Sequence, residues 1–275
     1  MQLLAALPFA PNEVGLAANI AGRAADLVTK NKVQPDTESV TRFLARFEVL
    51  ESTSGYHIEH AVEKLAERFP VAVFLTLWRR NQSRKTGNQT IQGLAYDFAG
   101  LPFRNILKAP EVAELLVDFE RRAFAGEPVD SDESLLVRSA IQHDENSRGW
   151  LEAAVQRAQN EDQLHFVRRL GSVGEAENPA LAFPQFTKSL LLRARELGPS
   201  CYETIFQKLT HVGGGRGSTN NEPDEGWKSL LSVIEELACQ YAEDGELGPL
   251  FSTMAKYERA WMESERSRRV IEEDD

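Results

Sequence analysis

The fold is decided by two similar stretches, residues 70–80, PVAVFLTLWRR, and residues 110–122, PEVAELLVDFERR. Each begins with a proline, which the first turn of a helix tolerates because the N–H there has no intrahelical partner. A constant offset of 41 residues pairs Val71 with Val112, Phe74 with Leu115, Leu75 with Leu116, Trp78 with Phe119 and Arg80 with Arg121. A period of about 40–47 residues is typical of repeats in which pairs of helices stack on one another.

Helical spacing of apolar residues continues through most of the chain, in residues 40–50, 58–69, 186–197, 227–241 and 250–261. No segment shows the two-residue alternation of a half-buried strand, and prolines divide the chain into pieces of helix length. The sequence therefore predicts an all-α fold of about ten to twelve helices, stacked as antiparallel pairs in an α-solenoid or a compact helical array.

The same pattern predicts a single helical-repeat domain over residues 1–275. The polar stretch at 124–131 is a candidate for a soft boundary within it. Residues 263–275 end in four consecutive acidic side chains and are expected to form an acidic, frayed tail.

Composition restricts the class of partner. The chain has 31 Lys and Arg against 42 Asp and Glu, a net charge of −11, which disfavours binding to nucleic acid because phosphates require a cationic surface. No apolar run approaches the ~20 residues of a membrane-spanning helix. The N-terminal apolar run stops at Pro8 without a cationic segment before it, so a secretion signal is not expected. We expect a cytoplasmic protein that contacts no membrane, with its two cysteines, Cys201 and Cys239, buried and inert on apolar-rich segments.

Two motifs invite a cofactor or metal. The loop Gly213, Gly214, Gly215, Arg216 is rich enough in glycine to wrap an anion, but it lacks the lysine and the preceding strand of a nucleotide-binding loop. His57, His60 and Glu63 are candidate metal ligands that share a helix face, and a metal-dependent hydrolase using the two histidines is one alternative function. The two histidines do not have H-E-x-x-H spacing, so the competing interpretation of this cluster is a solvated helix start. The competing interpretation of the glycine-rich segment is a mobile loop. No cofactor is predicted.

Arginines supply the other candidate surface. Three Arg pairs, beginning at Arg79, Arg121 and Arg168, are predicted near helix C-termini, where cations complement the helix dipole. The candidate contact residues are Arg79, Arg80, Arg84, Arg121 and Arg122, together with the glycine-rich loop. If the pairs align on one edge they form an Arg ladder, which would suit a nucleic-acid-associated adaptor.

The stretch 56–70, YHIEHAVEKLAERFP, resembles a HEAT-type repeat, and residues 184–262 continue in the same style. Their order is similar to the C-terminal helical-repeat regions of large bacterial multidomain proteins, including signal-transducing NTPases of conflict systems. This resemblance implies an α-solenoid used for recognition or scaffolding, with any catalytic domain elsewhere.

No base, nucleophile and oxyanion donor are implied together by the sequence, so we expect no catalytic activity. The predicted function is a protein-interaction, scaffold or sensing module, in the setting of bacterial defence or signalling that the resemblance implies. Its partner would be another protein, contacted through residues 211–224, which would become ordered on binding. Trp78, Trp150 and Trp261 would anchor the interface where they are exposed, although Trp78 and Trp261 lie on apolar stripes that favour the core.

Overall fold

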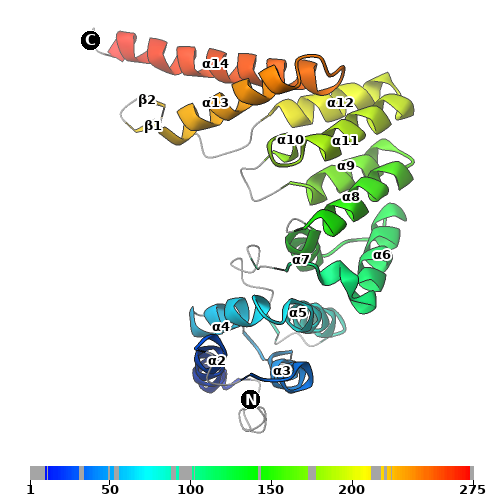
Figure 1. Cartoon of the computed structure of the whole chain (residues 1–275), viewed down its shortest axis with the longest axis vertical. Helices are drawn as coiled ribbons and strands as arrows, with labels where there is room; N and C mark the ends of the chain where they lie inside the picture. Colours follow the sequence, from blue (N-terminus) through cyan, green and yellow to red (C-terminus); the bar gives the residue numbers. More distant parts are fainter. Residues whose placement is uncertain are drawn as a thin grey trace. The chain divides into compact units, whose positions relative to one another are not determined.

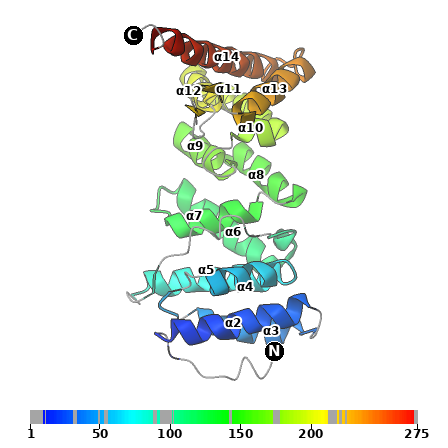
Figure 2. The same ribbon diagram turned by 90° about the vertical axis from the view of Figure 1, so that its left-hand side faces the viewer.

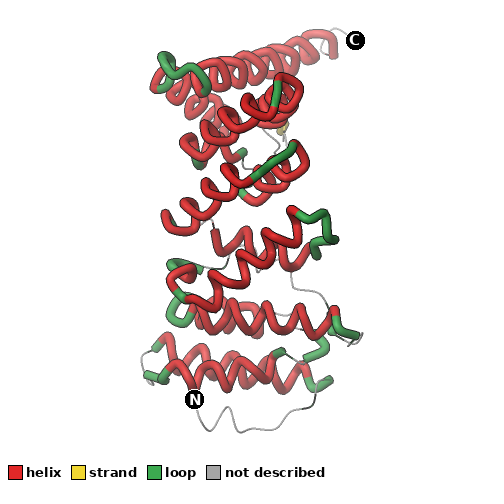
Figure 3. The backbone as a smooth tube through the Cα atoms, turned by 90° about the vertical axis from the view of Figure 1, so that its right-hand side faces the viewer, coloured by secondary structure: helices red, strands yellow, loops and turns green. Residues whose placement is uncertain are grey.

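The protein is all-α in its computed structural model (Figures 1 and 3). The structure describes residues 10, 12–30, 34–48, 50–52, 56–87, 91–92, 101, 103–141, 144–172, 178–211, 218–219, 222–223 and 225–272. The α-helices are α2 (Val14–Thr29), α3 (Thr37–Leu44), α4 (Tyr56–Ala66), α5 (Pro70–Lys85), α6 (Pro110–Phe124), α7 (Ser131–Ile141), α8 (Glu145–Arg157), α9 (Glu161–Leu170), α10 (Pro179–Ala182), α11 (Pro184–Leu197), α12 (Pro199–Thr210), α13 (Glu225–Gln240) and α14 (Leu247–Glu272).

The described part of the chain adds two 3-10 helices, η1 (Ala45–Phe47) and η3 (Ile106–Lys108), and two two-residue antiparallel strands, β1 (Ser218–Thr219) and β2 (Glu222–Pro223). The predicted all-α class is thus confirmed. These residues form thirteen α-helices, slightly more than predicted, partly because Pro179 starts a single four-residue turn of helix, α10.

Helix starts follow the local chemistry of the sequence. Proline occupies the first turn of α5, α6, α11 and α12, as the sequence pattern predicts. Asp36 caps α3 by accepting a hydrogen bond from the backbone N–H of Ser39 at 2.7 Å. Asn160 caps α9 in the same way through the N–H of Gln163. Each cap satisfies a backbone donor that the first helical turn leaves without a partner.

The chain divides into two compact units, residues 1–150 and 151–275, which we call unit 1 and unit 2. The division falls within α8. Residues 124–131 lie inside unit 1, between α6 and α7, and α14 continues through residues 263–272. None of the helices in the described ranges is both long and apolar enough to cross a membrane.

In unit 1 helix pairs pack in layers, α2 on α4 and α3 on α5, with α4 beside α5 and α5 against α7 (Figure 2). Its core includes edge-on aromatic contacts between Phe74 and Phe103 and between Trp78 and Phe119, with ring centroids 5.5 Å and 6.4 Å apart. All four rings are buried. Trp78 and Phe119 are the aromatic residues that the 41-residue offset aligns, so the two similar stretches contact each other through corresponding positions.

In unit 2 α11 packs on α9 and α12, while α14 packs on α12 and α13. Gly198 alone links α11 to α12, with a φ of 136° that residues bearing a side chain rarely adopt. Gly171, after α9, lies against the buried ring of Phe186, and a Cβ at this glycine would come within 2.8 Å of Phe186 Cζ. The absence of a side chain at residue 171 is therefore what allows α11 to approach the end of α9 closely.

Candidate functional site

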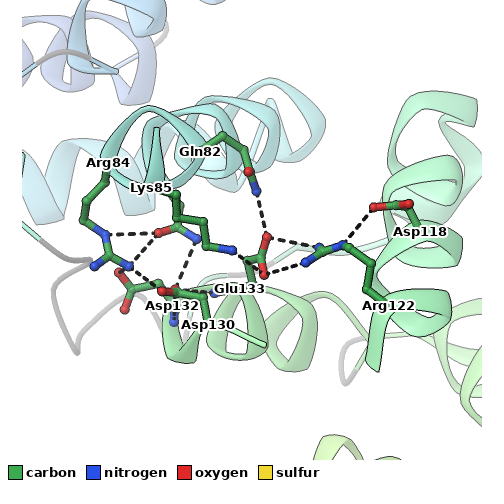
Figure 4. Close-up of polar contacts among 9 residues, drawn as sticks. Gln82, Arg84, Lys85, Asp118, Arg122, Asp130, Asp132 and Glu133 are labelled. Atoms are coloured by element: carbon green, nitrogen blue, oxygen red, sulfur yellow. Dashed lines mark hydrogen bonds and ion pairs between the residues drawn. The ribbon is translucent and has the colours of Figure 1, made fainter. Parts of the chain in front are cut away.

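The densest polar contacts in unit 1 join three helices (Figure 4). We call this group the α5–α7 polar cluster. Its members are Asn81, Gln82, Arg84 and Lys85 on α5, Asp118 and Arg122 on α6, and Asp130, Asp132 and Glu133 at the start of α7.

Glu133 is the centre of the cluster, and its side chain is fully buried. Lys85 Nζ lies 2.7 Å from Oε2, and the Gln82 amide donates to Oε1 at 2.7 Å. Arg122 adds a donor to each oxygen, at 3.2 and 3.4 Å. A buried carboxylate is tolerated only with such a set of donors, because removing its charge from water is otherwise very unfavourable.

Asp130 links α5 to the N-terminus of α7. One carboxylate oxygen accepts the backbone N–H of Asp132 at 2.9 Å, which caps the helix. The other lies 2.7 Å from Arg84 Nη2, and the same guanidinium reaches Asp132 at 3.2 Å. Asn81, buried on α5, donates to Asp130 and accepts from Arg84, so it orients both groups.

The electrostatics of the cluster favour the ionised forms of Glu133 and Asp130. Burial acts to raise the pKa of Glu133, but hydrogen bonds from Lys85, Arg122 and Gln82 outweigh it and hold the pKa below its ordinary value. For Asp130, burial is likewise outweighed by the N–H of Asp132 and by Arg84. A carboxylate with a depressed pKa and with both oxygens already accepting hydrogen bonds is a poor general acid or base, so the cluster acts as a clamp between helices.

The predicted Arg79–Arg80 pair does not lie at a helix end, because α5 continues to Lys85. Arg79 is exposed and pairs with Glu48 at 3.1 Å. Arg80 is buried and donates to the carbonyls of Phe47 and Leu50, and also to those of Glu51 and Gln92. Burial lowers its pKa to about 10, and repulsion from Arg84 adds to the effect. Arg80 therefore anchors the segment after η1 and is not available on a surface.

The other candidate arginines of unit 1 are also engaged. Arg84 and Arg122 belong to the α5–α7 polar cluster. Arg121 is exposed in the last turn of α6, and its guanidinium lies 2.7 Å from Asp118. Each candidate cation of unit 1 thus has an acidic or carbonyl partner within the unit, which neutralises much of the surface that a phosphate backbone would need.

The structure places only part of the predicted metal cluster. His60 and Glu63 are exposed neighbours on α4, with His60 Nδ1 3.6 Å from Glu63. The side chain of His57 and the loop of Gly213, Gly214, Gly215 and Arg216 lie outside the described residues. Within the described ranges no group of three or more His, Cys, Asp or Glu side chains is placed to hold a metal ion.

The cysteine prediction is half right. Cys201 is buried, and burial raises the pKa of its thiol. Cys239 is exposed instead, because it lies one position beyond Ala238 and off the buried stripe of α13, which runs through Trp227, Leu231 and Ile234.

A second polar clamp joins the helices of unit 2. Asp244, before α14, accepts the backbone N–H groups of Glu246 and Leu247 at 3.0 Å, and its other oxygen lies 2.6 Å from Lys188. The hydrogen bond from Lys188 lowers the pKa of Asp244 to about 2, with help from these N–H groups. Glu246 is buried and accepts hydrogen bonds from Arg195 and from the Tyr202 hydroxyl.

Aromatic side chains reach the surface of unit 2 along α14. Tyr257 is 58% exposed, with its ring centroid 6.4 Å from that of exposed His211. One turn further on, Trp261 is half-buried against the ring of buried Trp227, with centroids 5.0 Å apart. We call His211, Tyr257 and Trp261 the aromatic surface. The sequence pattern placed Tyr257 and Trp261 on an apolar stripe, but the buried face of α14 follows Phe251, Met254 and Glu258, which leaves Tyr257 at its edge.

Comparisons of the sequence with family models, and of the chain with curated proteins and with solved structures, found no match.

Proposed function

We propose that this protein is a non-catalytic interaction module of the HEAT-like helical-repeat type that binds another protein through the aromatic surface of unit 2. The setting that the sequence resemblance suggests is sensing or scaffolding in a bacterial defence or signalling system. The observation that carries the proposal is the exposure of Tyr257 beside His211 and Trp261.

The chemistry of these side chains suits a protein partner. Tyrosine and tryptophan are enriched at the centres of protein interfaces, because they bury a large apolar area with few rotatable bonds and keep a polar group for hydrogen bonding. Tyr257 is the more exposed of the two aromatic side chains on α14, and Trp261 is half-buried.

The aromatic surface is also held in place before binding. Trp227 supports Trp261 from within the core. Asn178 caps α10 and donates to the carbonyls of Leu209 and His211, which fixes the end of α12. A preorganised surface loses less conformational entropy on association, so more of the contact energy appears as affinity.

A nucleic-acid-associated adaptor is the weaker candidate. The predicted Arg ladder and Arg84 would have to supply its cationic surface, whereas Arg80, Arg84 and Arg122 are all used inside unit 1.

The test compares two exposed apolar positions in the full chain, Tyr257→Ser on α14 and Val117→Ser on α6. Val117 is 59% exposed, so both variants should fold, because substitutions at such sites change stability by about 0.5 kcal/mol or less. Each tagged variant is used for quantitative affinity capture from cells that express the protein naturally.

We expect one stoichiometric protein partner with the unmodified chain and with Val117→Ser. Its recovery should fall about fivefold or more with Tyr257→Ser, as truncation of an interface anchor typically produces. Equal recovery with both variants, or purified protein that turns over a substrate without a partner, would contradict the proposal.

A further inference from the structure

Arg168, in the last turn of α9, has a half-buried guanidinium that forms no ion pair within the described part of the chain. Its Nε is buried and has no hydrogen-bond acceptor, and no carboxylate pairs with it among the described residues. Burial and the adjacent Arg169 both lower the pKa of Arg168. A buried N–H without an acceptor is unfavourable, which makes this position one that an added anion would stabilise.

Other half-buried arginines of the protein are arranged differently. Arg122 donates to Glu133 and Asp118, and Arg84 to Asp130. Arg193, also in unit 2, donates through Nε and Nη2 to the carbonyl of Ala158 at 2.9 and 2.8 Å. These three guanidiniums thus have acceptors. The Nε of Arg80 is also buried without an acceptor, but its other nitrogens donate to carbonyls, whereas no acceptor is found for the Arg168 guanidinium among the described residues.

Further cations gather beside Arg168. Arg169 and Lys208 are exposed, and no ion pair joins either one to another residue in the described ranges. Glu161 interacts electrostatically with Cys201, and His165, one turn along α9, interacts with Lys208 further along α12. Both helices also pack on α11. The charged groups of α9 and α12 are therefore close enough to act on one another.

The acidic side chain of Glu161 accompanies these cations. Glu161 lies 3.5 Å from His165 on the same helix. The pKa of His165 is nevertheless lowered, by burial first and then by Arg168, with Lys208 adding to the effect against the opposing pull of Glu161. Arg168 and Lys208 are therefore both close enough to act on His165 electrostatically, although the chain as a whole carries a net charge of −11.

We propose that His165, Arg168, Arg169 and Lys208 form a docking site for an acidic segment of the protein partner. This site is called the α9–α12 cationic surface below. A carboxylate placed against Arg168 would accept the buried Nε–H together with a second guanidinium N–H, the paired geometry that arginine and carboxylate favour. Arg169 and Lys208 would hold a second acidic side chain of the same segment.

The size of the site favours a protein segment over nucleic acid. A nucleic-acid site commonly neutralises about six to ten phosphates, whereas three uncompensated cations match two or three carboxylates. The net charge of −11 also repels the dense charge of a nucleic-acid backbone more strongly than it repels a short peptide.

The test uses the isotope-labelled full chain and an eight-residue oligoglutamate peptide as the probe, followed by NMR at low salt. The test variant combines Arg168→Gln, Arg169→Gln and Lys208→Gln. The control combines Arg23→Gln, Arg104→Gln and Lys256→Gln, which removes the same three charges from exposed positions elsewhere. An eight-nucleotide single-stranded RNA is the competing probe.

Oligoglutamate should shift the amide signals of residues 161–170 and 201–210, and the test variant should bind it about tenfold more weakly, as loss of three charge contacts implies. The control should bind with nearly unchanged affinity. Peptide binding should also raise the pKa of His165, because the added carboxylates offset Arg168 and Lys208. The proposal is overturned by equal weakening in both variants, by absent shifts, or by tighter binding of the RNA at these residues.

This inference rests on the proposed function, and affinity capture separates the two. If the partner is lost with Tyr257→Ser but retained at full level with the triple cation variant, the interaction module stands and the α9–α12 cationic surface is wrong. If both changes release the partner while the charge-matched control retains it, both proposals are supported. If neither change affects recovery, both fail.

Discussion

Replacing Glu133 by glutamine tests whether the α5–α7 polar cluster acts as a clamp. Glutamine has the same shape, so no cavity forms, but Lys85 and Arg122 lose their shared negative partner, and the new amide N–H₂ faces their donors. Removing one member of a buried ion pair costs about 3–5 kcal/mol. Lys85 is 28% exposed and Arg122 retains Asp118, so both charges are partly relieved by other contacts. We therefore expect Glu133→Gln to lower the free energy of unfolding of unit 1 by about 3 kcal/mol, at the lower end of this range.

Amide hydrogen exchange measures this loss locally. The slowest amides of α5 and α7 exchange only when unit 1 opens, so their exchange rates report its stability. A loss of about 3 kcal/mol corresponds to exchange that is faster by about a hundredfold or slightly more. Glu127→Gln, at an exposed position after α6, removes the same charge without touching the cluster and should change the rates by less than about threefold.

A double-mutant cycle identifies the contact responsible. Lys85→Met combined with Glu133→Gln should destabilise unit 1 by clearly less than the sum of the two single changes, because each removes the same interaction. The description of Glu133 as the centre of a clamp is wrong if the amides of α5 and α7 exchange at the same rate in Glu133→Gln and Glu127→Gln. It is also wrong if the destabilising effects of Lys85→Met and Glu133→Gln simply add.

Further predictions concern pH and packing. The folded pKa of Glu133 lies below its ordinary 4.5, so the unfolded chain binds more protons as pH falls. The stability that Glu133 contributes at neutral pH should therefore disappear as the pH falls from about 4.5 through the folded pKa. The urea midpoints at pH 7 and pH 3 should then differ less in Glu133→Gln than in the unmodified protein. The carboxyl carbon of Asp244 should titrate by NMR near pH 2, and Asp244→Ala, which removes the cap of α14, should destabilise unit 2 by about 1–2 kcal/mol in urea denaturation. Gly171→Ala should destabilise unit 2 by about 1–3 kcal/mol through its clash with the Phe186 ring, and Phe186→Leu in the same chain should restore part of that loss; simple addition of the two effects would show that the clash is not the cause.

Much of the fold follows from local sequence signals. Helical spacing of apolar residues sets the class, and prolines at positions 70, 110, 184 and 199 mark helix starts because proline favours the first turn. The 41-residue offset aligns Trp78 with Phe119, and the two rings contact each other in the core. These signals depend on neighbours within a turn or two, which is why they can be recognised without the structure.

The polar sites depend on contacts between distant segments. Arg80 resembles the other arginines in sequence, yet it is buried because the carbonyls of residues 47–51 and 92 converge on it. Glu133 follows Asp130 in an ordinary acidic helix start, and only the approach of Gln82 and Lys85 makes it a buried ion pair. One local signal could have indicated this buried ion pair. It is an acidic residue at a capped helix start that lies opposite the basic end of another helix.

The most direct test of the proposed interaction is hydroxyl-radical footprinting of the protein alone and in complex with its captured partner. Tyr257 is 58% exposed in the free protein and should be oxidised readily, with Trp261 less so. If the aromatic surface binds the partner, the partner should strongly reduce oxidation of both side chains and leave oxidation of Val117 unchanged. Unaltered oxidation of Tyr257 and Trp261 in a saturated complex would contradict the proposal.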